Sequence, residues 1–143
     1  MVGGYGSAAG GYALNVTVVV PPPLPVESEP NDDAASADTL DLNVDLRAEL
    51  SAGDSDWFAV TTTADGQVVT FETGLSESGI FVDTVITVYD QDGTTELGTD
   101  DDMGPGHFSR LTLTLPTAGT YYVKVTGYAA STTGAYVLRA VSY

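Results

Sequence analysis

The side chains best suited to chemistry gather in one acidic stretch, residues 27–33, which reads Glu-Ser-Glu-Pro-Asn-Asp-Asp. It offers carboxylate and amide oxygens and contains neither lysine nor arginine. Ligands of this kind suit Ca²⁺, which takes about six to eight oxygens at loose geometry. A solvated acidic linker is the alternative, because runs of charge are often only hydrated. The oxygen-bearing residues of the stretch are Glu27, Glu29, Asn31, Asp32 and Asp33.

A second acidic group comes later in the chain, around a turn at residues 90–93. Asp83 begins the strand expected over residues 84–89 and Asp90 ends it, so the two lie roughly 20 Å apart and cannot share one ion. A hairpin would instead bring Asp90 and Asp92 close to the acids at 100–102, which could form a second calcium site. An exposed acidic loop is the alternative. The members of this group are Asp90, Asp92, Asp100, Asp101 and Asp102.

Catalysis of the familiar hydrolytic kinds finds little support in the residue types. The chain has one histidine, His107, within a Gly-Pro-Gly-His-Phe loop, and no Gly-x-Ser-x-Gly sequence to present a nucleophile. A catalytic zinc site needs several histidine, cysteine or carboxylate ligands in set positions, and there is neither a histidine pair nor a cysteine. A pair of carboxylates for glycoside hydrolysis is not excluded by composition. We therefore expect a protein that is not an enzyme.

The net charge of the chain limits the kinds of molecule that it can bind. The 143 residues include 20 acidic and 4 basic side chains, which gives a net charge of −16. Such a chain repels nucleic acid and anionic membranes, and no stretch is long and apolar enough for insertion into a bilayer. It requires cations, either bound at sites or as a screening atmosphere, so we expect a secreted, extracellular or cell-surface protein in a calcium-rich or saline, halophilic habitat. The N-terminus lacks a basic signal-peptide region, which suggests a piece excised from a longer exported protein.

The elements that must position these acids are β-strands. Glycine, threonine, valine and tyrosine are abundant, and short apolar-alternating runs are separated by turn residues. The pattern predicts an all-β protein, an antiparallel, jelly-roll-like β-sandwich of about seven or eight strands. Residues 34–40 fit either one helical turn or a loop. The expected strands cover residues 44–50, 57–60, 68–73, 84–89, 111–115, 121–125 and 136–140.

The first 20 residues repeat the end of the chain. Residues 2–16 parallel residues 125–140: both read Val-x-Gly-Tyr, a loop of small residues, and then Tyr-x-Leu. The N-terminus therefore resembles the last hairpin of a preceding copy of the same domain. Three parts follow from this: residues 1–20, a polyproline linker at 21–26, and a sandwich domain at 27–143.

An orphan strand of this kind must pair with something. It could occupy the last-strand position, or augment a free edge, of a neighbouring copy, and this head-to-tail contact would propagate into a filament. Neighbouring copies of the domain are therefore expected partners. The residues expected in the assembly strand, 12–20, are Tyr12, Leu14, Val16 and Val18.

Four motifs in one order carry a family resemblance. They are Glu-Ser-Glu-Pro-Asn-Asp at 27–32, Gly-Asp-Ser-Asp-Trp-Phe at 53–58, Asp-Thr-Val-Ile-Thr-Val-Tyr-Asp-Gln-Asp-Gly at 83–93, and Ala-Gly-Thr-Tyr-Tyr-Val-Lys-Val at 118–125. Over residues 27–143 the chain resembles the bacterial pre-peptidase C-terminal domain family, which is similar to the collagen-binding modules of clostridial collagenases.

The resemblance implies a non-catalytic β-sandwich appended to a secreted peptidase or surface protein, with calcium bound where the N-terminal linker meets the sandwich. Binding of a protein substrate is a further implication, with Tyr121, Tyr122 and Tyr128 as candidate contacts. Two acidic segments about 20 residues apart would repel each other unless a cation joined them, which agrees with the implied site. The calcium ligands that the resemblance implies are Glu27, Glu29, Asn31 and Asp32 from the linker and Asp54 and Asp56 from the sandwich.

Overall fold

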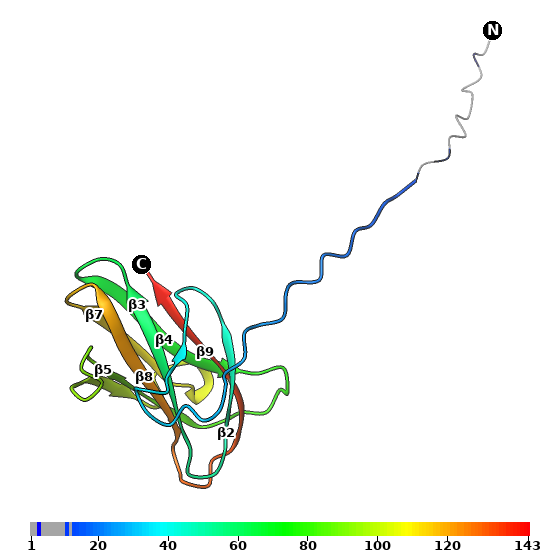
Figure 1. Cartoon of the computed structure of the whole chain (residues 1–143). Helices are drawn as coiled ribbons and strands as arrows, with labels where there is room; N and C mark the ends of the chain where they lie inside the picture. Colours follow the sequence, from blue (N-terminus) through cyan, green and yellow to red (C-terminus); the bar gives the residue numbers. More distant parts are fainter. Residues whose placement is uncertain (1–2, 4–10, 12) are drawn as a thin grey trace.

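The computed structural model describes residues 3, 11 and 13–143, and from residue 38 onward the chain forms a sandwich of two β-sheets (Figure 1). This confirms the predicted all-β class and sandwich architecture. A 3-10 turn, η1 (Pro105–His107), joins two of the strands. The strands are β1 (Asp38–Thr39), β2 (Leu46–Leu50), β3 (Ser55–Thr62), β4 (Gln67–Leu75), β5 (Thr84–Tyr89), β6 (Glu96–Asp100), β7 (Arg110–Leu115), β8 (Gly119–Gly127) and β9 (Gly134–Ser142).

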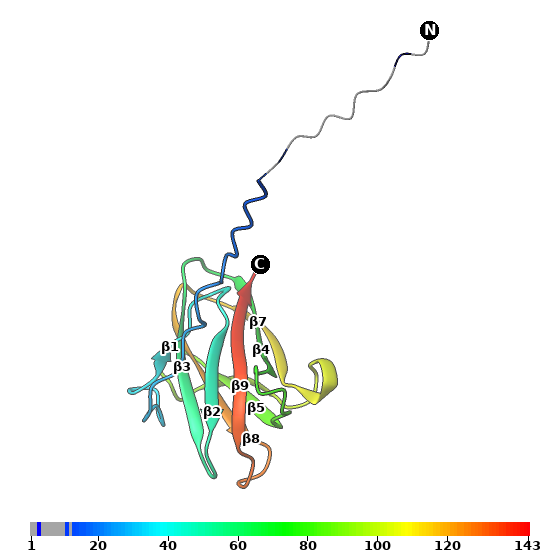
Figure 2. The ribbon, with the colours of Figure 1, turned by 90° about the vertical axis from the view of Figure 1, so that its right-hand side faces the viewer.

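Successive strands along the chain belong almost alternately to the two sheets. One sheet has the order β1-β3-β8-β5-β6 and the other has the order β2-β9-β4-β7. Apart from the short parallel pairing of β1 with β3, the ladders between these strands are antiparallel. Most connections therefore pass from one sheet to the other, and the β2–β3 turn lies at the end of the sandwich opposite the one from which the N-terminal segment extends (Figure 2).

Alternation of side chains produces the core. In β3, Phe58 and Val60 point inward and are fully buried, while Trp57 and Ala59 face outward. Register carries the same parity into β8, where Val123 pairs with Phe58. Each sheet thus contributes one apolar face. The remaining buried apolar side chains are Leu40, Leu46, Ala48, Leu50, Val69, Phe71, Val82, Ile86, Val88, Leu115, Tyr121, Val125, Tyr136, Leu138 and Ala140.

Two strands were not expected from the sequence, and one expected strand begins later than predicted. β6 has a single large apolar residue, Leu97, so its pattern looks like an acidic loop, and β1 is only two residues long. The strand expected from residue 44 begins at Leu46, because Asn43 adopts a left-handed φ of 64° and Val44 donates to the Asp41 carbonyl in a turn. Residues 34–40 form a turn followed by β1.

The N-terminal segment lies outside the sandwich. Residues 13–25 run as an extended chain with no strand assigned, leading away from the two sheets (Figures 1 and 2). Tyr12 and the repeat residues 1–2 and 4–10 lie outside the described part of the chain. Within the described part, no helix has the length and apolar character needed to cross a membrane.

Candidate metal site at the linker junction

Residues 21–37, which contain the polyproline segment and the acidic stretch that follows it, are called the linker from here on, and this linker is attached to both sheets. The Arg47 N–H in β2 donates to the Pro25 carbonyl at 2.8 Å, and the Glu27 N–H donates back to the Arg47 carbonyl at 3.0 Å. Farther along, the Trp57 N–H in β3 donates to the Asn31 carbonyl at 2.9 Å. The acidic stretch therefore crosses from the edge of one sheet to the other, so its side chains meet those at the start of β3.

This crossing brings the expected ligands together. Carboxylate oxygens of Glu27, Glu29 and Asp56 lie within 4.8 Å of one another, and so do those of Glu29, Asp32 and Asp54. Glu29 belongs to both groups. Asn31 joins them, since its amide donates to Glu27 at 3.3 Å. The six residues that the family resemblance implied thus lie in one cluster, formed by the linker, the turn before β3 and the first residues of β3.

Two oxygens in the cluster are buried without a partner. Asn31 and Asp56 are fully buried, and Asn31 Oδ1 and Asp56 Oδ1 accept no hydrogen bond from the described residues. Their other polar atoms are used: Tyr136 Oη–H donates to Asp56 Oδ2 at 2.5 Å, and Asn31 Nδ2 also donates to Asp38 Oδ2 at 3.4 Å. Leaving buried acceptors unsatisfied is costly, so the two free oxygens fit a cation as their missing partner.

The raised pKa values of two carboxyls in the cluster are those expected of buried acids with no cation beside them. Burial raises the pKa of Asp56 from 3.8 to about 8, although the hydrogen bond from Tyr136 acts in the opposite direction. Burial likewise raises the pKa of Glu27 to about 7, against hydrogen bonds from the Glu49 N–H and Asn31. Glu27, Asp54 and Glu29 add repulsion at Asp56. Without a cation, burial and mutual repulsion therefore favour the neutral, protonated form of the Asp56 and Glu27 carboxyls.

Two residues that support the cluster were not predicted from the sequence, and one acid of the stretch 27–33 has a different role. Asp38 fixes the linker by accepting the Ser28 N–H at 2.6 Å, and Tyr136, expected only as the first residue of the strand at 136–140, donates to Asp56. No local pattern marks either one: Asp38 belongs to the two-residue strand β1, which was not expected, and Tyr136 comes from β9, 80 positions after Asp56. Asp33 instead caps a turn: its Oδ1 accepts from the Ala35 and Ser36 N–H groups at 2.9 Å, and bonds from Ser36 lower its pKa.

The acidic residues expected to form a second metal site do not all lie close to one another. In the β5–β6 hairpin, Asp100 pairs with Ile86, four positions before Asp90, so Asp90 and Asp100 stand roughly 13 Å apart along the strand. Asp92 accepts from the N–H groups of Thr94 and Thr95 at 2.8 and 2.7 Å, and Asp100 accepts from the Arg110 N–H at 2.7 Å. The hairpin turn and the far end of β6 are opposite ends of one ladder, which separates Asp90 and Asp92 from Asp100, Asp101 and Asp102.

The histidine and the candidate tyrosines have ordinary surroundings. His107 is exposed beside Asp102, with 3.7 Å between Nδ1 and Oδ1. Tyr121 is fully buried and donates to the Thr117 carbonyl at 2.7 Å, so it is unavailable to a ligand, whereas Tyr128 is exposed. The outer face of the larger sheet instead carries a stacked pair, Trp57 and Tyr89, with ring centroids 4.9 Å apart.

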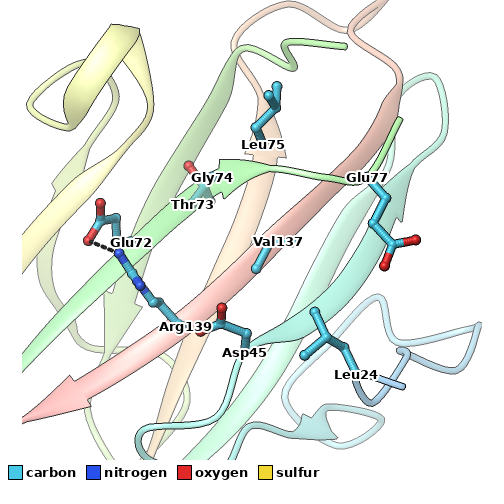
Figure 3. A pocket seen from close by; sticks show the side chains of 9 residues that line it. All are labelled: Leu24, Asp45, Glu72, Thr73, Gly74, Leu75, Glu77, Val137 and Arg139. Carbon is cyan, nitrogen blue, oxygen red and sulfur yellow. Dashed lines mark hydrogen bonds and ion pairs between the residues drawn. The ribbon is translucent and has the colours of Figure 1, made fainter. Parts of the chain in front are cut away.

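A shallow hollow of about 340 Å³ lies on the outer face of the smaller sheet, and none of the six cluster residues lines it (Figure 3). Arg139 of β9 pairs there with Glu72 of β4 at 3.3 Å. Leu24 contributes to its lining from the linker and is the first partly buried residue of that segment. The sandwich therefore begins to hold the chain at Leu24, within the expected polyproline linker at 21–26.

Comparison with known proteins places the fold in a known class of non-catalytic accessory domains. The model of the bacterial pre-peptidase C-terminal domain family matches residues 54–127, and the chain belongs to that family. Domains of this family occur in secreted proteins. No curated protein matches the chain.

Many solved structures resemble this chain, among them the two that follow. The pre-peptidase C-terminal domain of collagenase from Bacillus anthracis superposes with a TM-score of 0.56 at 19% identity, covering 73% of this chain and 93% of that one. PliG from Aeromonas hydrophila, a periplasmic lysozyme inhibitor of g-type lysozyme, gives a TM-score of 0.50 at 17% identity, covering 71% and 95%. At these identities the likeness concerns architecture alone.

Proposed function

We propose that the chain is a non-catalytic extracellular accessory module whose linker is fastened to the sandwich by Ca²⁺. The observation that carries the proposal is the pair of buried, unpartnered oxygens, Asn31 Oδ1 and Asp56 Oδ1, within a cluster of carboxylates. The cluster offers oxygen ligands only, which suits Ca²⁺ better than metals that prefer nitrogen or sulfur.

Calcium would act on the linker as well as on stability. Glu27, Glu29 and Asp32 belong to the linker, whereas Asp54 and Asp56 belong to the sandwich, so one ion bound among them joins the two parts. Binding energy then appears as resistance to unfolding. A linker held at this point would also fix the direction in which the chain preceding residue 24 leaves the sandwich.

Thermal unfolding in Ca²⁺ and in chelator, at one fixed high NaCl concentration, tests this function. We expect Ca²⁺ to raise the melting temperature of the wild type and to have little effect on Glu29→Gln/Asp56→Asn. The matched control is Asp101→Asn/Asp102→Asn, which removes the same charge outside the cluster and should keep the full response. Equal stabilisation of all three proteins by NaCl and KCl, with no saturation at low Ca²⁺, would instead identify the acids as a salt-adapted surface.

A second function, as a subunit of an assembly, is favoured by the N-terminal segment. Its large apolar side chains Leu14, Val16, Val18, Val19 and Val20 are between 73% and 82% exposed. Such a run carries no charge in a chain of net charge −16, and it has the alternation and β-branching of a strand. We propose that residues 14–20 pair with a neighbouring copy of the domain, as a strand donated head to tail.

A further inference from the structure

We propose that the outer edge of β7 is the surface that receives residues 14–20 of a second copy. This inference rests on the strand-donation function proposed above and identifies its acceptor. It follows from comparing the four sheet edges that the described structure presents, which are formed by β1, β2, β6 and β7.

Three of the four edges are protected. β1 offers only two residues, and the edge of β2 is already occupied by the chain's own linker through the Pro25–Arg47 and Glu27–Arg47 hydrogen bonds. β6 carries Glu96 and Asp100 at its two ends and has a register irregularity where it pairs with Val88 and Tyr89. Acidic side chains and irregular pairing both discourage addition of another strand.

β7 lacks these protections from Leu111 to Leu115, and an acidic side chain, that of Asp100, occupies its edge only at the N–H of Arg110. It is a regular strand of six residues, Arg-Leu-Thr-Leu-Thr-Leu, that contains no acid and begins with one of the chain's four cations, Arg110. Its only partner among the described strands is β4. The Arg110 N–H points away from β4, toward Asp100. Residues of the same parity, Thr112 and Thr114, therefore also direct their backbone N–H and C=O groups outward.

The side chains beside this edge are incompletely covered. Leu111 and Leu113 of β7 and Leu97 of β6 are only partly buried, although they pack against the core. Gly98 faces Leu111 and Leu113, so β6 adds no side chain over them at that position. A donated strand whose alternate residues are Leu14, Val16 and Val18 would place apolar side chains on this seam, while its backbone pairs with Thr112 and Thr114.

The strand must come from another copy because the linker is too short for the chain's own β7. From the linker position outside β2 to a position outside β7 there are five strand spacings, or roughly 24 Å. The five residue steps from Val20 to Pro25 span at most about 16 Å as polyproline. A second molecule removes this restraint, and since each copy offers one strand and one edge, the contact is head to tail.

The test measures the mass of the full chain by light scattering after size exclusion, in Ca²⁺ and over a range of protein concentrations. The donor variant is Val16→Asp/Val18→Asp, which alters two exposed side chains outside the sandwich. Its matched control, Val16→Thr/Val18→Thr, keeps β-branched, uncharged residues. The acceptor variant is Thr114→Pro, which removes an outward N–H of β7, and its matched control, Thr114→Val, keeps that N–H. Circular dichroism verifies that each protein is folded.

We expect the wild type and both controls to form concentration-dependent oligomers, and the donor and acceptor variants to be monomeric. Burying an unpaired carboxylate in the donated strand should weaken association by about a hundredfold or more. The decisive measurement mixes the two variants, because one retains the edge and the other retains the strand. Their mixture should give dimers that grow no further.

The outcomes separate the acceptor from the donation itself. If Thr114→Pro assembles like the wild type while the donor variant does not, residues 14–20 are donated but β7 is not the acceptor. If the wild type is monomeric at every concentration, or if the donor variant assembles normally, strand donation is wrong altogether. A variant mixture that stays monomeric would also overturn the assignment of β7.

Discussion

Replacing Asp56 by asparagine should change the stability of the protein in opposite directions without calcium and in a large excess of calcium. The substitution keeps the size of the side chain and an oxygen that can accept the hydrogen bond from Tyr136. It removes a carboxyl that is fully buried and whose pKa is raised from 3.8 to about 8. In chelator the buried carboxyl must take up a proton at neutral pH for the protein to fold, and asparagine has no such cost.

The size and sign of the effect follow from the pKa. A raised pKa in the folded protein means that stability is fully present below the ordinary value near 4 and is lost as pH rises toward 8. At pH 7 the difference from 3.8 corresponds to about 4 kcal/mol, at about 1.36 kcal/mol for each pH unit. We therefore expect Asp56→Asn to make the calcium-free protein more stable at pH 7, by up to about 4 kcal/mol, and to give no such advantage near pH 4.

Calcium should narrow that difference and, in large excess, reverse it. A bound cation keeps the carboxylate ionised and stabilises the wild type by about 2.7 kcal/mol at about 100 times the Kd, so offsetting about 4 kcal/mol takes a concentration above about 1,000 times the Kd. The variant lacks this ligand and should gain much less. Urea unfolding is the assay, followed by the fluorescence of Trp57, which is the only tryptophan and neighbours the site.

Two results would refute the reasoning. A wild type whose stability in chelator is constant or increases from pH 4 to pH 8 would show that the carboxyl is not desolvated as the structure indicates. An unchanged calcium response in Asp56→Asn would remove Asp56 from the ligands. Some pH dependence should remain in the variant, because the pKa of Glu27 is raised in the same direction.

Two other substitutions test the residues around the cluster and the acids outside it. Tyr136→Phe should destabilise the protein by about 1–3 kcal/mol in urea unfolding, because Asp56 Oδ2 loses its only hydrogen-bond donor while buried. The response to Ca²⁺ should persist, and its complete loss would mean that Tyr136 does more than support Asp56. Asp92→Ala should lower the melting temperature by removing the acceptor of the Thr94 and Thr95 N–H groups. Hydrogen bonds from the Thr95 hydroxyl and from the Thr95 and Thr94 N–H groups lower the pKa of Asp92, so its contribution is present at neutral pH and is lost in acid. A changed calcium midpoint would contradict its placement outside the site.

The sequence predicted the fold where its pattern matched the period of a strand. Residues 111–115 alternate leucine with threonine, and β7 was recognised for that reason. β6 was missed because Glu96 to Asp100 contains one large apolar residue, so its strand conformation depends on pairing with β5. The pairing of strands far apart in the chain, such as β2 with β9, is likewise absent from any local pattern.

For the candidate site, the sequence by itself determined the kind of ligand: only oxygen donors stand at residues 27–33 and 54–56, in a chain with no cysteine and one histidine. The tertiary structure decided which of the acids meet. The crossing from β2 to β3 brings Glu27 and Glu29 to Asp56, and the sandwich core supplies Tyr136 from a strand 80 positions away. The pairing of β5 with β6 also keeps Asp90 and Asp100 apart, since they lie at opposite ends of that ladder. Local sequence fixes the chemistry of each side chain, whereas distances between side chains depend on strand pairing over the whole chain.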